Sequence, residues 1–263
     1  MIELVDIGVN LTNKNLLADL DGVLQRAANA GVTRLVVTGT SLTDSAQAIE
    51  LCARHPARLV STCGMHPHHA SDWNADSYRD LGNLARQSCV RAIGETGLDF
   101  NRNYSPAAAQ ELAFEQQMVL AAELQLPLFC HQRDAHERFA AMLRENRDRL
   151  GRVVVHCFTD SREALIEYLD LDCYIGITGW ICDERRGIEL RELVKLIPED
   201  RLLLETDAPY LLPRNLEPKP SSRINEPAYL RHILGEVARY QQRPIDSLAQ
   251  AVLLNSRRFF DLR

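Results

Sequence analysis

The sequence predicts an α/β fold of the (β/α)8 TIM-barrel type, the barrel of the metal-dependent, amidohydrolase-like hydrolases. Eight short apolar runs recur along the 263 residues, and stretches with the apolar spacing of helices separate them. Several of these runs end at a histidine or a carboxylate. Alternating strands and helices are typical of a parallel sheet, and polar side chains at strand ends are typical of a barrel whose strand ends carry the chemistry.

The expected strands occupy the eight apolar runs. They cover residues 4–7, 34–38, 59–64, 90–95, 128–131, 153–156, 173–177 and 202–205. Helical spacing of apolar side chains predicts helices over residues 16–27, 112–126 and 188–197, and a further helix begins near Ser161. A doubly wound open sheet is the structural rival. It would normally have fewer strands and a glycine-rich turn after the first, which residues 6–10 lack.

We expect residues 1–263 to form a single domain. No internal repeat, low-complexity tract or linker interrupts the alternating pattern. The proline-rich stretch 209–227 follows the eighth expected strand, and a loop in that position should lie over the active face.

Composition and charge narrow the classes of function. The net charge is −6 with a pI near 5.8, which argues against a protein that coats nucleic acid by bulk electrostatics. No run of about 18 apolar residues predicts a membrane span, and the first residues lack the pattern of a signal peptide. The seven cysteines include no C-x-x-C pair and are expected to be buried thiols. These features predict a cytoplasmic protein that does not associate with membranes.

Four side chains stand at the ends of four separate expected strands. They are Glu95, His131, His156 and Asp207. Carboxylates and imidazoles together can hold a divalent ion, which lowers the pKa of a bound water and offsets charge on the oxygen under attack. We predict that all four are metal ligands. Glu95 and Asp207 are also the predicted catalytic residues: Glu95 can bridge two ions about 3.5–4 Å apart, and Asp207 can orient the water or take its proton.

Some of these residues have a structural interpretation as well. Asp207 could cap the turn that follows it. His66 and His68 follow the third strand and either contact substrate or phosphate or pack the loop. Arg133 follows the fifth strand and is a predicted substrate contact. Asp99 is expected to be a structural partner of the site.

These residues belong to segments that resemble the TatD family of metal-dependent deoxyribonucleases, and the resemblance covers essentially the whole chain. The segments are Gly64-Met-His-Pro-His, Gly94-Glu-Thr-Gly-Leu-Asp, His131-Gln-Arg-Asp-Ala, Val155-His-Cys-Phe-Thr, Glu205-Thr-Asp-Ala-Pro-Tyr and Asn225-Glu-Pro. The resemblance implies a metal-dependent exonuclease that trims single-stranded DNA or RNA from the 3′ end, with one or two divalent ions.

The chain departs from the family pattern at the first strand. Most relatives carry Asp-x-His-x-His there, whereas this chain has Asp6, Gly8 and Asn10. Glycine cannot bind a metal, and the asparagine amide is a weak ligand. The loss of two imidazoles favours a hard, oxygen-preferring ion at that position, so the predicted cofactor is Mg²⁺ or another divalent metal.

Two other functions remain open from the residues. An amidohydrolase-type enzyme would act on a cyclic amide, lactone or amine, but such enzymes usually need His-x-His at the first strand and often a lysine at the fourth, and both are missing. A non-catalytic barrel would bind nucleic acid or a protein without turnover, and the retained ligand set argues against it. The sequence predicts single-stranded nucleic acid as the partner and indicates no obligate protein partner.

Overall fold

Within residues 2–262, eight β-strands form one sheet whose strands follow each other in chain order. The computed structural model describes residues 2–262. The strands are β1 (Leu4–Val9), β2 (Val32–Val37), β3 (Leu59–Cys63), β4 (Val90–Asp99), β5 (Leu128–Arg133), β6 (Val153–Val155), β7 (Cys173–Ile177) and β8 (Leu202–Leu204). They lie in the eight predicted runs, with ends that differ by up to four residues.

Helices connect consecutive strands, and two further helices follow the eighth strand. They are α1 (Lys14–Leu17), α2 (Leu20–Asn29), α3 (Leu42–Arg54), α4 (Ser77–Ala85), α5 (Ala107–Leu124), α6 (His136–Asn146), α7 (Arg162–Asp170), α8 (Ile188–Leu193), α9 (Leu230–Gln241) and α10 (Ile245–Phe260). Short 3-10 turns follow β3 (Pro67–Asp72) and β7 (Gly179–Cys182). None of the helices within residues 2–262 has the length and apolarity to span a bilayer.

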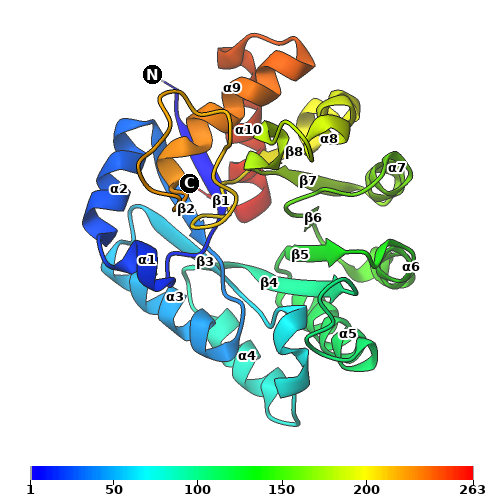
Figure 1. Cartoon of the computed structure of the whole chain (residues 1–263). Helices are drawn as coiled ribbons and strands as arrows, with labels where there is room; N and C mark the ends of the chain where they lie inside the picture. Colours follow the sequence, from blue (N-terminus) through cyan, green and yellow to red (C-terminus); the bar gives the residue numbers. More distant parts are fainter. Residues whose placement is uncertain (1, 263) are drawn as a thin grey trace. The chain divides into compact units, whose positions relative to one another are not determined.

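The chain divides into two compact units, and the one formed by residues 38–156 and 163–174 carries β3 to β6. These strands pair in parallel: β4 joins β3 on one side and β5 on the other, and β5 joins β6. Helices α3 and α4 pack on β3, and α5 packs on β4; Figure 1 draws these helices in blue, cyan and green. Phe114 and Phe139 stack with ring centroids 5.2 Å apart and anchor α5 to α6 in the core.

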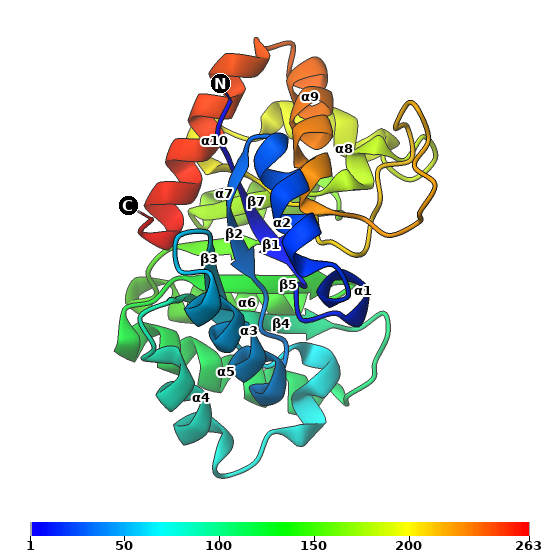
Figure 2. The same ribbon diagram turned by 90° about the vertical axis from the view of Figure 1, so that its left-hand side faces the viewer.

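The other unit comprises residues 1–37, 157–162 and 175–263. In it β1 pairs with β2, β7 pairs with β8, and an isolated bridge joins Val9 to Ala208. Helix α10 packs against β1, β8 and α9, and Figure 2 shows it in red beside the start of β1. The prediction of a single domain stays a prediction.

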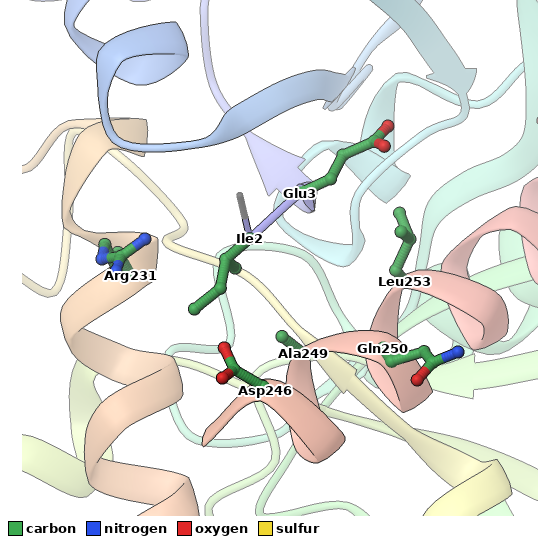
Figure 3. Close-up of a pocket in the computed structure, with 7 residues that line it drawn as sticks. All are labelled: Ile2, Glu3, Arg231, Asp246, Ala249, Gln250 and Leu253. Atoms are coloured by element: carbon green, nitrogen blue, oxygen red, sulfur yellow. The ribbon is translucent and has the colours of Figure 1, made fainter. Parts of the chain in front are cut away.

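A cavity of about 610 Å³ opens in this unit beside the start of β1 (Figure 3). Its lining mixes acidic, basic and apolar side chains and contains no histidine or cysteine: Ile2, Glu3, Arg231, Asp246, Ala249, Gln250 and Leu253. Glu3 and Ile2 precede β1, so the cavity belongs to the N-terminal end of that strand. In parallel barrels this end serves stability, while the opposite strand ends carry the chemistry.

One helix that was predicted to be continuous is divided in two. The apolar spacing predicts a continuous helix over residues 16–27, but the chain forms α1 and α2 with a break at Asp19. Asp19 has a non-helical backbone (φ −141°), and its carboxylate pairs with Arg26 at 2.9 Å. Aspartate favours the position before a helix, and this local preference outweighs the apolar spacing that runs through it.

Candidate metal centre

Glu95 lies in the middle of β4, and its side chain is buried. The strand passes very close to β5 on both sides of Glu95, because Gly94 and Gly97 have no side chains. Both have positive φ angles, +147° and +129°. A Cβ atom at either position would overlap the backbone oxygen of Phe129 or of His131. The two glycines therefore let β4 lie against β5 where Glu95 and His131 meet.

Three histidines surround one oxygen of Glu95. Its Oε1 atom lies 2.8 Å from His156 Nε2, 3.2 Å from His131 Nδ1 and 3.3 Å from His66 Nε2. All four residues belong to the unit that carries β3 to β6. The sequence predicted Glu95, His131, His156 and Asp207 as metal ligands. The structure brings the first three together and places His66, a buried side chain in the loop that follows β3, beside the same carboxylate oxygen.

The donor set fits a divalent cation. One ligand atom from each of His66, Glu95 and His131 lies within 4.8 Å of the other two. Imidazole nitrogens with a carboxylate oxygen are common ligands of divalent metals in hydrolases. The cluster is also largely shielded from water, which strengthens the attraction between a carboxylate and a cation. The structure therefore supports a divalent metal site at these residues.

Asp99, at the end of β4, holds His131 from its far side. Its Oδ2 atom lies 3.2 Å from His131 Nε2 and 2.7 Å from His68 Nε2. Its Oδ1 atom accepts hydrogen bonds from the backbone N–H groups of Asn101 and Arg102. Because His131 Nε2 faces Asp99, the Nδ1 atom is the one that faces Glu95. A carboxylate behind a ligand histidine fixes the ring and its tautomer, so Asp99 is a positioning residue.

Electrostatics favour ionised carboxylates in the cluster. Burial alone would raise the pKa of Glu95, but the nearby His156 and His66 and the hydrogen bond with His131 lower it well below its usual value. Burial likewise acts to raise the pKa of Asp99, and its hydrogen bonds with His131, Arg102 and His68 outweigh that effect and lower it. Two negative carboxylates therefore stand among the imidazoles at neutral pH.

The histidines respond to the same environment in opposite directions. Burial lowers the pKa of His66 to about 4, although Glu95 partly offsets this. Burial also acts to lower the pKa of His131, but its hydrogen bonds with Asp99 and Glu95 outweigh burial and raise it. The Nδ1 atom of His66 accepts the backbone N–H of His68, so in the neutral ring the proton lies on Nε2, the nitrogen that faces Glu95. Binding of a cation through Nε2 would displace that proton. A histidine binds a cation through an unprotonated nitrogen, so metal binding at His131 competes with the proton that its raised pKa favours.

Asp207 belongs to the other unit and follows β8 in a left-handed backbone conformation (φ +54°). Its N–H donates to Gly8 O at 2.9 Å, and its Oδ1 atom accepts a hydrogen bond from Asn10 Nδ2 at 2.9 Å. Asn10, which stands where most relatives are expected to have histidine, thus orients the Asp207 side chain. The roles of Asp207 as metal ligand and catalytic residue stay predictions.

Asp6 is fully buried and ties β1 to the segment after β8. Its two carboxylate oxygens accept hydrogen bonds from the backbone N–H of Thr206 at 2.9 Å and from the Thr206 hydroxyl at 2.5 Å. Burial raises the pKa of Asp6 to about 8, although these two hydrogen bonds act to lower it. Asp6 therefore has a structural role within this unit.

Glu205 is a buried acid that sequence reasoning did not single out. It directly follows the three leucines of β8, and its Oε1 atom accepts a hydrogen bond from the backbone N–H of Cys157 at 2.6 Å. The sequence did contain a signal for it, namely an acidic residue at the end of a strongly apolar run. An acid in such a place is rarely buried without a hydrogen-bond partner.

The two remaining predicted substrate contacts lie at the edge of the cluster. His68 is bound to Asp99, and its backbone N–H donates to His66 Nδ1 at 3.0 Å. Arg133 ends β5 directly opposite Asp99 in the strand register and is partly exposed. Contact of His66, His68 or Arg133 with a substrate stays a prediction.

Comparison with known sequences gives a full-length match. The family described as TatD related DNase matches residues 5–261. The chain is 53% identical to the 3'-5' ssDNA/RNA exonuclease TatD of Pantoea ananatis, over 98% of this chain and 99% of that protein. It is 52% identical to the protein of the same name from Edwardsiella piscicida, over 98% of this chain and all of that one.

Comparison with solved structures also gives matches to proteins of the TatD family. A hydrolase of the TatD family from Entamoeba histolytica aligns with a TM-score of 0.91 and 27% identity, covering 99% of both chains. A TatD homolog from Escherichia coli aligns with a TM-score of 0.90 and 28% identity, covering 100% of this chain and 99% of that one. With the strand order, these matches confirm the predicted (β/α)8 barrel class. The chain belongs to the TatD family of related DNases.

Proposed function

We propose that this protein is a Mg²⁺-dependent exonuclease that removes nucleotides from the 3′ end of single-stranded DNA or RNA. The observation that carries the proposal is the buried cluster of Glu95 with three histidines in a chain 53% identical to an exonuclease of that specificity. The proposed setting is the cytoplasm, with DNA repair or degradation as the process that it serves.

Each residue of the cluster has a distinct task. A divalent cation bound here would supply a Lewis acid that activates water and offsets charge on the attacked phosphate. Glu95 offers the anionic oxygen that attracts the cation, and His131, His156 and His66 offer nitrogen atoms from three directions. Asp99 keeps His131 turned so that its Nδ1 atom faces Glu95.

Asp207 is the proposed proton acceptor. An ionised carboxylate can orient the attacking water and take its proton as the new P–O bond forms. The bond from phosphorus to the 3′ oxygen of the shortened strand breaks in the same step, and that oxygen takes up a proton from solvent. The hydrogen bond from Asn10 and the backbone bond to Gly8 hold Asp207 in one orientation. Arg133 is the proposed phosphate contact, since its planar guanidinium can donate two parallel hydrogen bonds to phosphate oxygens.

Two features bear on the choice of ion. The substitution of Gly8 and Asn10 for the histidines of the first-strand pattern removes two nitrogen ligands, and that loss supports Mg²⁺. The histidines around Glu95 are donors that Mn²⁺ and Zn²⁺ also accept. The preferred ion is therefore determined by removing bound metal with a chelator and then measuring the exonuclease activity with Mg²⁺, Mn²⁺ or Zn²⁺ added.

The test is a cleavage assay with single-stranded oligonucleotides that carry a label at the 5′ end or at the 3′ end. The proposal predicts a ladder of shortening products from the 5′ label and immediate release of labelled mononucleotide from the 3′ label. Chelator should abolish both, and Mg²⁺ should restore them. Glu95→Gln should lower kcat/KM by at least about 100-fold, since it removes the anionic ligand.

The matched control is Glu115→Gln, the same chemical change at an exposed residue of α5 in the same unit. It should cleave like the wild type. Undiminished cleavage by Glu95→Gln would contradict the assigned site. Internal cuts as the first products would contradict the exonuclease assignment, and release of ammonia or ring opening of a cyclic amide without nucleotide release would favour an amidohydrolase.

A further inference from the structure

A strongly exposed aromatic side chain stands beside the metal centre in the same unit. Tyr104 lies in the loop after β4, and 66% of the residue is exposed. Its ring meets the ring of His68 edge-on, with centroids 4.7 Å apart, and His68 meets His66 at 4.3 Å. Two ring contacts therefore connect the exposed tyrosine to a residue that touches Glu95.

The loop that presents Tyr104 is fixed by hydrogen bonds. The next residue, Ser105, is fully buried, donates its hydroxyl to His68 O at 3.1 Å and accepts the N–H of Ser71 at 3.0 Å. Its backbone oxygen accepts a bond from Gln110 Nε2 at 2.8 Å. A loop tied down in this way costs less entropy to order when a ligand arrives than a loop without such bonds.

The residue before Tyr104 is also set in one conformation. Asn103 has φ +50°, and its side-chain amide donates to Phe100 O at 2.6 Å. Asparagine tolerates this left-handed conformation better than most residues, so the turn is built to a fixed shape. The turn and the buried Ser105 together aim Tyr104 outward next to His68.

The fold itself makes little use of the Tyr104 side chain. Within residues 2–262 its hydroxyl forms no hydrogen bond, and most of the residue is exposed. Tyrosine is favoured where an apolar ring is wanted together with a polar tip, and aromatic faces bind unpaired bases by stacking. The exposed ring thus offers a contact surface beside the site where the proposed reaction takes place.

We propose that Tyr104 is a stacking platform for a base of the single-stranded substrate next to the cleaved phosphate. The inference rests on the proposed function, because it assigns a base-binding residue to that same site. Stacking suits an enzyme that must accept every sequence, since each base has a flat aromatic face. Tyr104 would hold the strand while Glu95 and the histidines act on the phosphate.

The first experiment compares kcat and KM for a single-stranded oligonucleotide. Tyr104→Ala should raise KM by about 5- to 150-fold, the range expected for one stacked base, and should leave kcat within about twofold. Tyr104→Phe should behave like the wild type, because it keeps the ring and loses only the hydroxyl. Leu112→Ala is the control: it removes an exposed apolar side chain from α5 of the same unit.

The second experiment removes the base instead of the ring. Two oligonucleotides are used, one with an abasic nucleotide at the last position and one with it at the penultimate position. For the wild type, one of the two should have a higher KM than the intact oligonucleotide. For Tyr104→Ala, the same abasic substrate should show no additional rise, because the two changes remove one and the same contact.

The outcomes separate the inference from the proposed function. Equal KM values for Tyr104→Ala and Leu112→Ala, or additive effects of the abasic site and the mutation, would overturn the stacking role. An equal loss in Tyr104→Phe and Tyr104→Ala would assign the contact to the hydroxyl and also overturn it. If the wild type releases no nucleotide, the proposed function fails. The inference is then decided by the affinity for a fluorescent single-stranded oligonucleotide, compared between Glu95→Gln and the double variant Glu95→Gln/Tyr104→Ala. Equal affinities of the two variants would overturn the stacking role.

Discussion

At the scale of single residues, the centre is built around two carboxylates with different tasks. Glu95 faces three histidines with one oxygen, whereas Asp99 stands behind His131 and His68. The hydrogen bonds that Asp99 accepts from Asn101 and Arg102 fix it in turn. The position of His131 therefore depends on a residue that need not touch the metal.

Asp99→Asn tests this positioning role. The amide keeps the shape of the side chain but loses the charge that orients the two histidines. We expect the affinity for Mn²⁺ to fall about 10- to 100-fold, the usual effect of removing such a partner. Calorimetric titration of the chelator-treated protein measures it. Asp148→Asn, at an exposed aspartate of the same unit, should bind Mn²⁺ like the wild type, and equal affinities for the two variants would refute the role.

The sequence predicted part of this site for a clear reason. Glu95, His131 and His156 each follow an apolar run, so their strand positions bring them to one place. His66 lies in the loop beyond the end of β3, and whether a loop residue turns toward the cluster depends on packing that the sequence pattern does not contain. For the same reason Tyr104 gave no signal, because its exposure follows from the buried Ser105 beside it.

At the scale of the elements, the decisive contact is the one between β4 and β5. The sequence predicted a fourth strand that ends at Glu95, but β4 continues to Asp99. Gly94 and Gly97 make that continuation possible, because a side chain at either position would run into the backbone of β5. Glycine weakens the interior of a strand and often stands where another backbone approaches closely, and the close approach of β5 explains its presence inside this one.

Gly97→Ala should therefore destabilise the protein. The added methyl group meets His131 O, and the positive φ angle alone costs about 1–3 kcal/mol for a residue with a side chain. We expect a clearly lower urea midpoint and weaker metal binding, since His131 must shift. Gly151→Ala is the control, because nothing lies within 4 Å of its added methyl group. Equal midpoints for the two variants would contradict the close contact.

The link between β1 and the segment after β8 predicts a pH dependence of stability. The pKa of Asp6 is raised by burial to about 8 in the folded protein, so the native state holds a proton that the unfolded chain releases near pH 4. The stabilisation that comes from the protonated Asp6 side chain is fully present below about pH 4. It is lost as pH rises from about 4 to about 8, because the unfolded chain releases this proton over that range and the folded protein does not.

Asp6→Asn should remove that dependence. Relative to the wild type, the variant should gain up to about 1.4 kcal/mol of unfolding free energy for each pH unit between pH 5 and pH 7. Urea unfolding of both proteins at the two pH values measures the difference. A constant difference between wild type and variant over this range would show that Asp6 is already ionised in the folded state.

At the scale of the whole molecule, the net charge of −6 limits how the protein can hold nucleic acid. Long-range attraction does not favour binding, so a few local contacts and the bound cation must supply the affinity. Each phosphate neutralised on a single strand contributes about −0.7 to the slope of log affinity against log salt. One to three phosphate contacts therefore predict a slope no steeper than about −2.

This slope can be measured from KM at several KCl concentrations with free Mg²⁺ held constant. The shallow slope should be the same for oligonucleotides of 10 and 30 nucleotides, because only the end of the strand is bound. A slope near −6, or one that grows with substrate length, would indicate an extended basic groove and contradict the account.

The class of the fold was predictable because it depends on a pattern repeated along the entire chain. Eight apolar runs separated by helical stretches leave few alternatives, and errors at single boundaries do not change the outcome. The break at Asp19 and the length of β4 depend on single contacts, with Arg26 and with β5, and such contacts have no counterpart in the spacing of apolar residues.

The central claim is that Glu95 and its histidines form the metal centre. The most direct measurement is anomalous diffraction from crystals soaked in Mn²⁺, collected for the wild type and for Glu95→Gln. We predict a strong anomalous peak within coordination distance of Glu95 and His131 in the wild type, and its loss in the variant. A peak at other residues, or one that persists unchanged without the carboxylate, would contradict the account.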